Sequence, residues 1–384
     1  MYPSITDLLR ELFGINVLLP VQTFGFFVAI SFLLAAYFLV KELKRKEKQG
    51  LLQPQYKKVL TDVPPKTSEI ILGSVLSFLF GFKLLFVAMH YVEFVDDPAA
   101  MIFSGNGILW GGILFAAVYI FYRYREVQKT KSKKPQWVDA AIHPHEQVGN
   151  ITLVAAAGGL LGAKIFHNLE NLDKFFADPA GELFSFSGLT MYGGLIVGAI
   201  AVLWYARSIN IPALHLVDAT APSLMLAYGV GRIGCQLAGD GDWGIINTAP
   251  KPPALSFMPD WFWSFNYPHN VINEGIPIPG CTGKHCMMLE TGVFPTPLYE
   301  AIVCILLFFL LWSVRKKFSA PGMLFSLYLL LNGIERFWIE RIRVNTLYHM
   351  GDFGFTQAQL ISSILILLGI AGLFYFRRKK VVPL

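Results

Sequence analysis

Charged side chains are scarce in this sequence. Asp, Glu, Lys and Arg make up only 15% of the 384 residues, whereas a soluble protein carries about 25%. Hydrophobic residues account for 54% of the chain. This balance argues against a soluble globular protein.

Cysteine is scarce as well. Four cysteines are too few for a small secreted fold that disulfides hold together. The first residues, MYPSITDLLRELFGIN, have no basic stretch that leads directly into a short apolar core. We therefore expect no cleaved signal peptide.

Long apolar runs, in contrast, recur along the chain. Each run is close to the roughly 20 residues that a helix needs to cross a bilayer. The sequence therefore predicts an all-α polytopic membrane protein with nine transmembrane helices and an extracytoplasmic loop region. The predicted spans cover residues 20–40, 68–91, 105–122, 148–168, 188–206, 216–237, 298–314, 321–340 and 357–376.

Lysine and arginine set the expected orientation of these spans. Basic segments follow the first, third, seventh and ninth spans, such as KELKRKEKQ after the first. The alternate loops carry little basic charge, and the long loop 238–297 has two lysines against five acidic residues. Because basic residues collect in cytoplasmic loops, we expect the N-terminus outside and the C-terminus in the cytoplasm. This topology accounts for the net charge of +6, so no nucleic-acid partner is expected.

Three charged residues share one face of the eighth predicted span. In NGIERFWIERIRVN, Arg336, Glu340 and Arg343 are spaced by four and then three residues, which places them on one side of a helix. Glu335 and Arg341 are expected to point elsewhere. Ionisable residues at membrane depth are functional hypotheses by default.

A further arginine, Arg232, lies within GVGRIG at the outer end of the sixth predicted span. Two helices are therefore expected to direct arginines at one point near the outer phosphate groups, and arginine suits bidentate phosphate contact. In the alternative interpretation these arginines extend to the interface, or pair with Glu340 and Asp240 to hold helices together.

Glycine and tyrosine gather at the same outer level. Glycine lets a neighbouring helix or a ligand approach the backbone closely. Tyr192 precedes two glycines at the start of the fifth span, and Tyr299 precedes an acid at the start of the seventh. A tyrosine at this level commonly belongs to the aromatic belt instead.

Four segments, in this order, resemble motifs of the prolipoprotein diacylglyceryl transferase family: YGGLIVG, GRIGCQLAGDGDWG, PTPLYEA and RFWIERIR. The family's R-x-x-x-E-x-x-R is matched in full, and its G-R-x-G-N-F-x-N-G-E is matched in part. The resemblance covers the first span and roughly residues 145–376. Where the family has H-G-G-L, this chain has Tyr192 in place of the histidine that is often regarded as the base, so the base is left unassigned.

The resemblance also implies a division of the chain. Residues 51–142, with two spans and a basic linker, look like an insertion. The expected parts are 1–50 with the first span, the insertion 51–142, the membrane core 143–376 with loop 238–297, and the basic tail 377–384.

The family moves a diacylglyceryl group from phosphatidylglycerol to the lipobox cysteine of a prolipoprotein signal peptide and releases glycerol phosphate. The resemblance therefore implies an enzyme of the bacterial cytoplasmic (inner) membrane, surrounded by membrane lipids, with its site on the extracytoplasmic side and no metal or cofactor. A thiolate nucleophile and a phosphate leaving group both benefit from fixed cations. A related transferase with another donor or acceptor, or a lipid-binding or lipid-moving protein without catalysis, are the alternatives.

Residue roles follow from the matched motifs. The expected catalytic residues are Arg232, Arg336, Glu340 and Tyr192. The expected substrate-binding residues are Gly193, Gly194, Gly231, Gly234, Gly239, Asp240, Tyr299, Glu300, Arg343 and His167. Candidate bases on the outer side are His167, His269, His285 and His349.

Two cysteines lie in the long outer loop, in GCTGKHC. Because the loop is expected outside the cytoplasm, a disulfide between Cys281 and Cys286 is the favoured interpretation. A metal site that combines these cysteines with His285 and His269 is the alternative.

Overall fold

The computed structural model describes residues 1–61, 63–131, 135–184, 188, 190–318, 320–350 and 353–378. Within these residues most of the chain is helical. The chain divides into two compact units. Unit 1 comprises Met1–Pro3, Thr23–Gln55 and His143–Leu384, and unit 2 comprises Ser4–Gln22 and Tyr56–Ile142.

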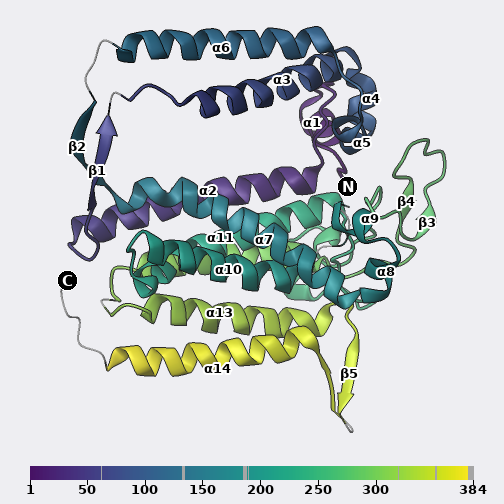
Figure 1. Cartoon of the computed structure of the whole chain (residues 1–384). Helices are drawn as coiled ribbons and strands as arrows, with labels where there is room; N and C mark the ends of the chain where they lie inside the picture. Colours follow the sequence, from purple (N-terminus) through teal and green to yellow (C-terminus); the bar gives the residue numbers. More distant parts are fainter. Residues whose placement is uncertain are drawn as a thin grey trace. The chain divides into compact units, whose positions relative to one another are not determined.

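Unit 1 contains most of the long helices, and their axes run roughly parallel in Figure 1. Its α-helices are α2 (Thr23–Lys48), α7 (Val148–Glu170), α8 (Leu172–Ala177), α9 (Pro179–Phe184), α10 (Met191–Ser208), α11 (Ala213–Ala238), α12 (Thr296–Val314), α13 (Met323–Ile339) and α14 (Gln357–Arg377). Its 3-10 helices are η1 (Pro144–Gln147), η2 (Pro253–Leu255), η3 (Asp260–Phe262) and η4 (Glu340–Ile342). Two antiparallel hairpins pair β3 (Ile276–Pro277) with β4 (Met287–Met288) and β5 (Leu347–Met350) with β6 (Phe353–Thr356).

Unit 2 is built around a pair of packed helices. Its helices are α1 (Ile5–Phe13), α3 (Thr67–Met89), α4 (Tyr91–Asp96), α5 (Pro98–Phe103) and α6 (Leu109–Lys131), and β1 (Gln55–Thr61) pairs with β2 (Gln136–Ile142). Gly81 and Gly111 face each other across α3 and α6. A Cβ atom at Gly81 would lie 2.4 Å from the carbonyl oxygen of Gly111, so only glycine permits this approach.

The helices are those of a multi-pass membrane protein. All nine predicted spans coincide with helices in the described part of the chain, and six of these helices are long and apolar enough to cross a bilayer. The six are α2, α3, α7 together with η1, α10, α12 and α14. Large apolar side chains, among them Trp204, Leu306 and Leu367, are exposed on their surfaces, as contact with lipid requires.

Some helices extend beyond their predicted ends. α2 continues to Lys48 rather than ending at residue 40, and α6 continues to Lys131 rather than ending at residue 122. Both extensions are rich in Lys, Arg and Glu, which end an apolar run but are good helix formers. Each helix therefore continues beyond the end of its hydrophobic segment.

Helix α11 is the centre of unit 1. It packs against α2, α12 and α13, and most of its residues are buried. Met225, Leu226 and Val230 join Cys304 and Phe308 of α12 in one apolar cluster. Because protein rather than lipid surrounds α11, this helix tolerates the polar residues that make it less apolar than its neighbours.

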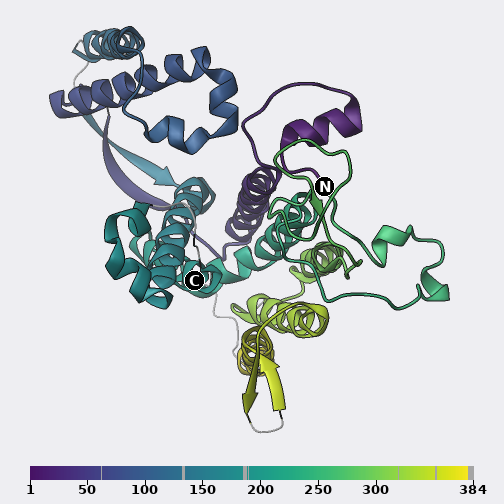
Figure 2. The same ribbon diagram turned by 90° about the vertical axis from the view of Figure 1, so that its right-hand side faces the viewer.

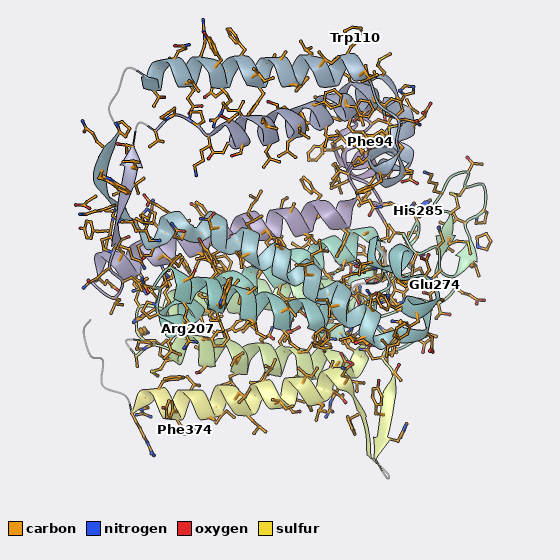
Figure 3. All side chains as sticks on the ribbon, in the orientation of Figure 1. Phe94, Trp110, Arg207, Glu274, His285 and Phe374 are labelled. Carbon is orange, nitrogen blue, oxygen red and sulfur yellow. A yellow bond between two sulfur atoms is a disulfide. The ribbon has the colours of Figure 1, made fainter. Side chains whose placement is uncertain are left out.

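The long loop between α11 and α12 lies at one end of the helices of unit 1, the end that faces the viewer in Figure 2. It has a small core of its own, made of Trp243, Tyr267, Leu289 and Val293. Glu274 and His285 mark this end in Figure 3, whereas Arg207, at the end of α10, marks the opposite end.

Candidate functional site

Glu300, near the start of α12, lies at the centre of a buried network of charges. Its side chain is fully buried. Arg232 of α11 places Nε 2.6 Å from Oε2, and the hydroxyl of Tyr228 donates to the same oxygen at 2.5 Å. Arg343 donates from one terminal nitrogen to Oε1 at 2.8 Å. One carboxylate thus joins α11, α12 and the segment that follows α13.

Asp242 is a second bridge between the same two arginines. Arg232 donates to Oδ2, and Arg343 donates to Oδ1 at 2.6 Å. Burial acts to raise the pKa of Asp242, but the two guanidinium groups outweigh it and lower the pKa below the usual range. The carboxylate partners of Arg232 are therefore Glu300 and Asp242, and not the Asp240 of the alternative interpretation.

Asp240 occupies a different environment in the turn that ends α11. Its Oδ1 accepts the backbone N–H of Asp242 at 3.3 Å, and its carboxyl interacts with the thiol of Cys235. Burial raises the pKa of Asp240. Gly239 ends the helix with φ 67°, a left-handed conformation that explains this glycine by backbone geometry.

Arg336 and Glu340 form the outer part of the network. One terminal nitrogen of Arg336 lies 2.9 Å from Oε2 of Glu340, as their spacing predicted. The other oxygen of Glu340 accepts from Asn345 at 2.5 Å and from the hydroxyl of Thr356 at 2.8 Å. Thr356 also caps α14, so the helix pair α13 and α14 fixes Glu340.

Three guanidinium nitrogens of the network have no hydrogen-bond partner among the described residues. One is Nε of Arg232, which the carboxylate of Glu300 nevertheless approaches to 2.6 Å. The other two are NH1 of Arg336, which lies 3.7 Å from Oε1 of Glu300, and Nε of Arg343. The side chain of Arg336 is 21% exposed, compared with 8% for Arg232. Arg336 is thus the most exposed of the three arginine side chains.

Tyr192, near the start of α10, is half-buried beside this part of the network. Its hydroxyl is within electrostatic range of Arg336, Glu340 and Arg343. The tyrosine of YGGL therefore lies in the electrostatic vicinity of the R-x-x-x-E-x-x-R residues.

The predicted glycines have packing contacts that account for several of them. A Cβ atom at Gly193 would lie 2.5 Å from the carbonyl oxygen of Gly162 in α7, and one at Gly194 would lie 3.0 Å from that of Gly159. Gly234 packs on Phe27 of α2 in the same way. A Cβ atom at Gly231, in contrast, would meet nothing within 4 Å. Roles of these glycines in substrate binding stay predictions.

Tyr299 and His167 have partners outside the charged network. The hydroxyl of Tyr299 donates to the carbonyl oxygen of Phe262 at 2.6 Å and thereby holds the long loop on α12. The ring of His167 lies 3.4 Å from the side-chain nitrogen of Asn171 and 3.8 Å from a carboxylate oxygen of Glu182. A role for either residue in substrate binding stays a prediction.

Three residues of the site were missed by the sequence interpretation. Tyr228 and Asp242 pair with the network, although no spacing rule connects them with Arg336 or Glu340. Glu335 was expected to point elsewhere, but it is 8% exposed and within electrostatic range of Glu300. Neither oxygen of Glu335 has a hydrogen-bond partner among the described residues.

The donor set of this site suits an anion better than a cation. Ligand atoms of Cys235, Asp240 and Asp242 lie within 4.8 Å of one another, a spacing that a metal ion accepts. Both oxygens of Asp242, however, are already held by arginines, whose positive charge opposes a metal ion. The spare donors on Arg336 and Arg343 are suited to phosphate or carboxylate oxygens.

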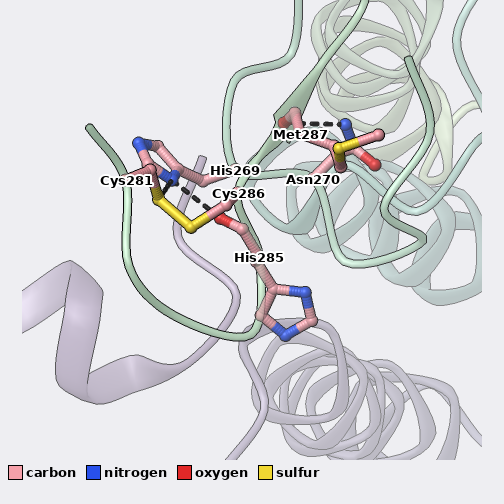
Figure 4. The surroundings of a disulfide bond; sticks show 6 residues. All are labelled: His269, Asn270, Cys281, His285, Cys286 and Met287. Atoms are coloured by element: carbon pink, nitrogen blue, oxygen red, sulfur yellow. Dashed lines mark hydrogen bonds between the residues drawn. A yellow bond between two sulfur atoms is a disulfide. The ribbon is translucent and has the colours of Figure 1, made fainter. Parts of the chain in front are cut away.

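The disulfide predicted in the long loop is confirmed. Cys281 and Cys286 are bonded, with Cα atoms 5.6 Å apart. Nδ1 of His269 donates to the carbonyl oxygen of His285 at 2.8 Å, and the ring of His285 points away from the disulfide (Figure 4). In this oxidised form the two sulfurs offer no thiolate for the alternative metal site.

Comparison with known proteins gives consistent matches. The family model described as prolipoprotein diacylglyceryl transferase matches residues 133–375. A protein of Leptospira interrogans named phosphatidylglycerol–prolipoprotein diacylglyceryl transferase is 28% identical over 270 residues, which cover 57% of this chain and 76% of the relative. Proteins of the same name from Corynebacterium glutamicum and Dehalococcoides mccartyi are 28% identical over 243 residues and 27% identical over 298 residues. The former match covers 62% of this chain and 72% of the relative, and the latter covers 74% and 95%.

Proposed function

The chain belongs to the prolipoprotein diacylglyceryl transferase family, and from this premise we propose that it transfers the diacylglyceryl group of phosphatidylglycerol to the cysteine thiol of a prolipoprotein. The observation that supports this most directly is the set of three arginines around Glu300, with unused donors on Arg336 and Arg343. A lipid phosphodiester is an anion of the size and geometry that such donors bind.

The contacts of the arginines refine their proposed roles. Arg336 and Arg343 contact the phosphate through their unused nitrogens, and Glu340 holds Arg336 in place. Arg232 is held by Glu300 and Asp242, so its main role is to fix these two carboxylates and to add positive charge to the site. Tyr192 donates a hydrogen bond to the phosphate from the side of α10.

The reaction forms one bond and breaks another at the same glycerol carbon. The thiolate sulfur attacks the carbon that carries the phosphate oxygen, the C–O bond breaks, and glycerol phosphate leaves with both electrons of that bond. The negative charge that develops on the phosphate is stabilised by fixed guanidinium groups. The same positive charge favours the thiolate over the thiol. Tyr192 is a poor base, because a tyrosine hydroxyl has a pKa near 10, so we assign it no part in accepting the thiol proton.

We further propose nine membrane crossings, with the N-terminus outside and the C-terminus in the cytoplasm of a bacterium. In this topology the arginine network faces the extracytoplasmic leaflet of the cytoplasmic membrane, where the disulfide of the long loop is also stable. Labelling of single cysteines introduced at residues 274 and 207 tests this orientation with an impermeant thiol reagent. Labelling of intact cells at residue 274 alone supports the orientation, and labelling at residue 207 alone contradicts it.

The decisive experiment is transfer in proteoliposomes. The full chain is reconstituted with phosphatidylglycerol and a lipobox peptide, and both the lipidated thiol and the released glycerol phosphate are measured. Both products are expected from the wild type, and Arg336→Ala should lose both. A protein that binds lipid but forms neither product is a non-catalytic relative, whereas transfer from another phospholipid alone identifies a different donor.

A further inference from the structure

A cluster of metal-ligand residues lies far from the arginine network. Gly234, close to Arg232, packs on Phe27 near the start of α2. Glu47 lies in the last turn of the same helix, 20 residues further on. At 1.5 Å per residue, the two ends are about 30 Å apart.

Glu47 is shared between two histidines that precede α7. Nδ1 of His143 lies 2.5 Å from Oε1 of Glu47, and Nδ1 of His145 lies 3.1 Å from Oε2. The two rings are 5.4 Å apart between centroids and face the same carboxylate. The three ligand atoms lie within 4.8 Å of one another.

The backbone holds both histidines in this arrangement. His143 precedes η1, and the carboxylate of Glu146 accepts the backbone N–H of His143 at 3.0 Å. Pro144 separates the two histidines and is buried, which restricts the backbone between them. The His-Pro-His sequence at the start of η1 therefore directs two imidazoles to one point.

We propose that Glu47, His143 and His145 form a binding site for a divalent transition-metal ion, with Zn²⁺ as the preferred occupant. Two imidazole nitrogens and one carboxylate oxygen are a ligand set that zinc accepts, with a fourth position left for water. Bonds of about 2.0–2.2 Å at tetrahedral angles place neighbouring ligand atoms about 3.3 Å apart. The observed separations of 2.5 and 3.1 Å need only a small opening of the cluster.

Binding needs no oxidant and no further reactant. Without metal, each Nδ1–H donates to one oxygen of Glu47. With metal, the proton of each neutral imidazole moves to Nε2, and the Nδ1 lone pairs and the carboxylate coordinate the ion. Since the metal joins the end of α2 to the start of α7, it braces the two segments that precede and follow Tyr56–Ile142 of unit 2.

The test is zinc binding by the full chain in detergent, purified without a polyhistidine tag and stripped with chelator. One Zn²⁺ per chain is expected, with coordination by two imidazoles in X-ray absorption spectra. Glu47→Gln and His145→Ala should each weaken binding about 100-fold or more. His90→Ala is the matched control, because the ring of His90 contacts the backbone carbonyl of Phe86.

Two results would overturn the proposal. One is a wild type that binds less than one zinc per chain at micromolar zinc. The other is wild-type affinity in both Glu47→Gln and His145→Ala. Should either variant misfold, Co²⁺ titration of the wild type decides alone: a visible absorption band that Zn²⁺ removes stoichiometrically supports the site, and its absence contradicts it.

Discussion

Two fully buried glutamates lie near opposite ends of unit 1, and they differ in what surrounds them. Glu42 of α2 accepts from Arg45 and from Arg315, which follows α12. The remaining contacts of Arg45 and Arg315 lead to Gln49 and to the backbone and ring of Trp312. No guanidinium nitrogen of this cluster is buried without a partner in the described part of the chain.

Glu300, at the other end of α12, also binds arginines, but its cluster leaves donors unused. NH1 of Arg336 and Nε of Arg343 are buried without a hydrogen bond among the residues that the structure describes. Unpaired buried donors cost free energy, so a cluster that serves only stability should resemble the one at Glu42. The comparison indicates that the Glu300 cluster is arranged for an added anion.

The most direct test of this difference is to remove one arginine from each cluster. Arg336→Ala should lower kcat/KM for transfer about 100-fold or more, because it removes a donor to the developing phosphate charge. Arg315→Ala should leave the rate within a few-fold of the wild type and lower the melting temperature instead. Equal rate losses in both variants would refute the distinction.

Removal of the two central carboxylates should give similar losses of stability. Glu42→Gln removes the carboxylate that Arg45 and Arg315 share. Glu300→Gln leaves Arg232 and Arg343 with Asp242 alone. Removal of one partner of a buried ion pair costs about 3–5 kcal/mol. Thermal unfolding in detergent measures this loss. Only Glu300→Gln is expected to reduce transfer further than the unfolded fraction explains, and normal activity per folded molecule would contradict its role in the site.

The pH dependence of stability should separate Asp242 from its neighbour Asp240. Burial raises the pKa of Asp242 in the folded protein, but Arg232 and Arg343 lower it by more, so the net shift is downward. Its stabilisation is therefore complete above the unfolded-state pKa of about 3.9 and is lost as pH falls below it. Asp242→Asn should flatten the acid decline in melting temperature below about pH 4.

Asp240→Asn serves as the control with the opposite sign. Burial raises the pKa of Asp240, so the ionised form destabilises the fold at neutral pH. The variant should therefore be at least as stable as the wild type at pH 7. If the melting temperature of Asp242→Asn falls at acid pH as steeply as that of the wild type, the pairing of Asp242 with the arginines contributes little to stability.

The smallest effect is expected at the disulfide. The double variant Cys281→Ser, Cys286→Ser removes a disulfide whose cysteines are only 5 residues apart. A disulfide that closes so short a loop removes little conformational entropy from the unfolded chain, so its loss costs little stability. Limited proteolysis should become faster around residues 278–288, while transfer stays within about twofold of the wild type. A large loss of transfer would place this part of the loop in the site.

Local geometry explains what the sequence predicted well. The pair of Arg336 and Glu340 follows from helical spacing alone, because residues four apart are neighbours on any helix. The disulfide follows from two cysteines five residues apart in one loop. Nine apolar segments were correctly predicted as helices, although the number that cross the membrane stays a prediction.

Tertiary contacts explain what the sequence could not provide. Whether Asp240 or Asp242 meets Arg232 depends on the turn after Gly239 and on Arg343, which lies 101 residues beyond Asp242. Likewise, the sequence around Gly193 and Gly194 does not distinguish a glycine that packs against a helix from one that contacts a ligand. The two compact units do not test whether residues 51–142 are an insertion into a membrane core, so this division of the chain stays a prediction.

The burial of α11 has a consequence for the assembly of the protein. This helix carries Arg232 yet is shielded on several sides by α2, α12 and α13. A segment with an arginine and few lipid-facing side chains is a poor substrate for insertion on its own. We expect α11 to enter the bilayer only together with its neighbours, so that biogenesis delivers the guanidinium and its carboxylate partners as one preassembled group.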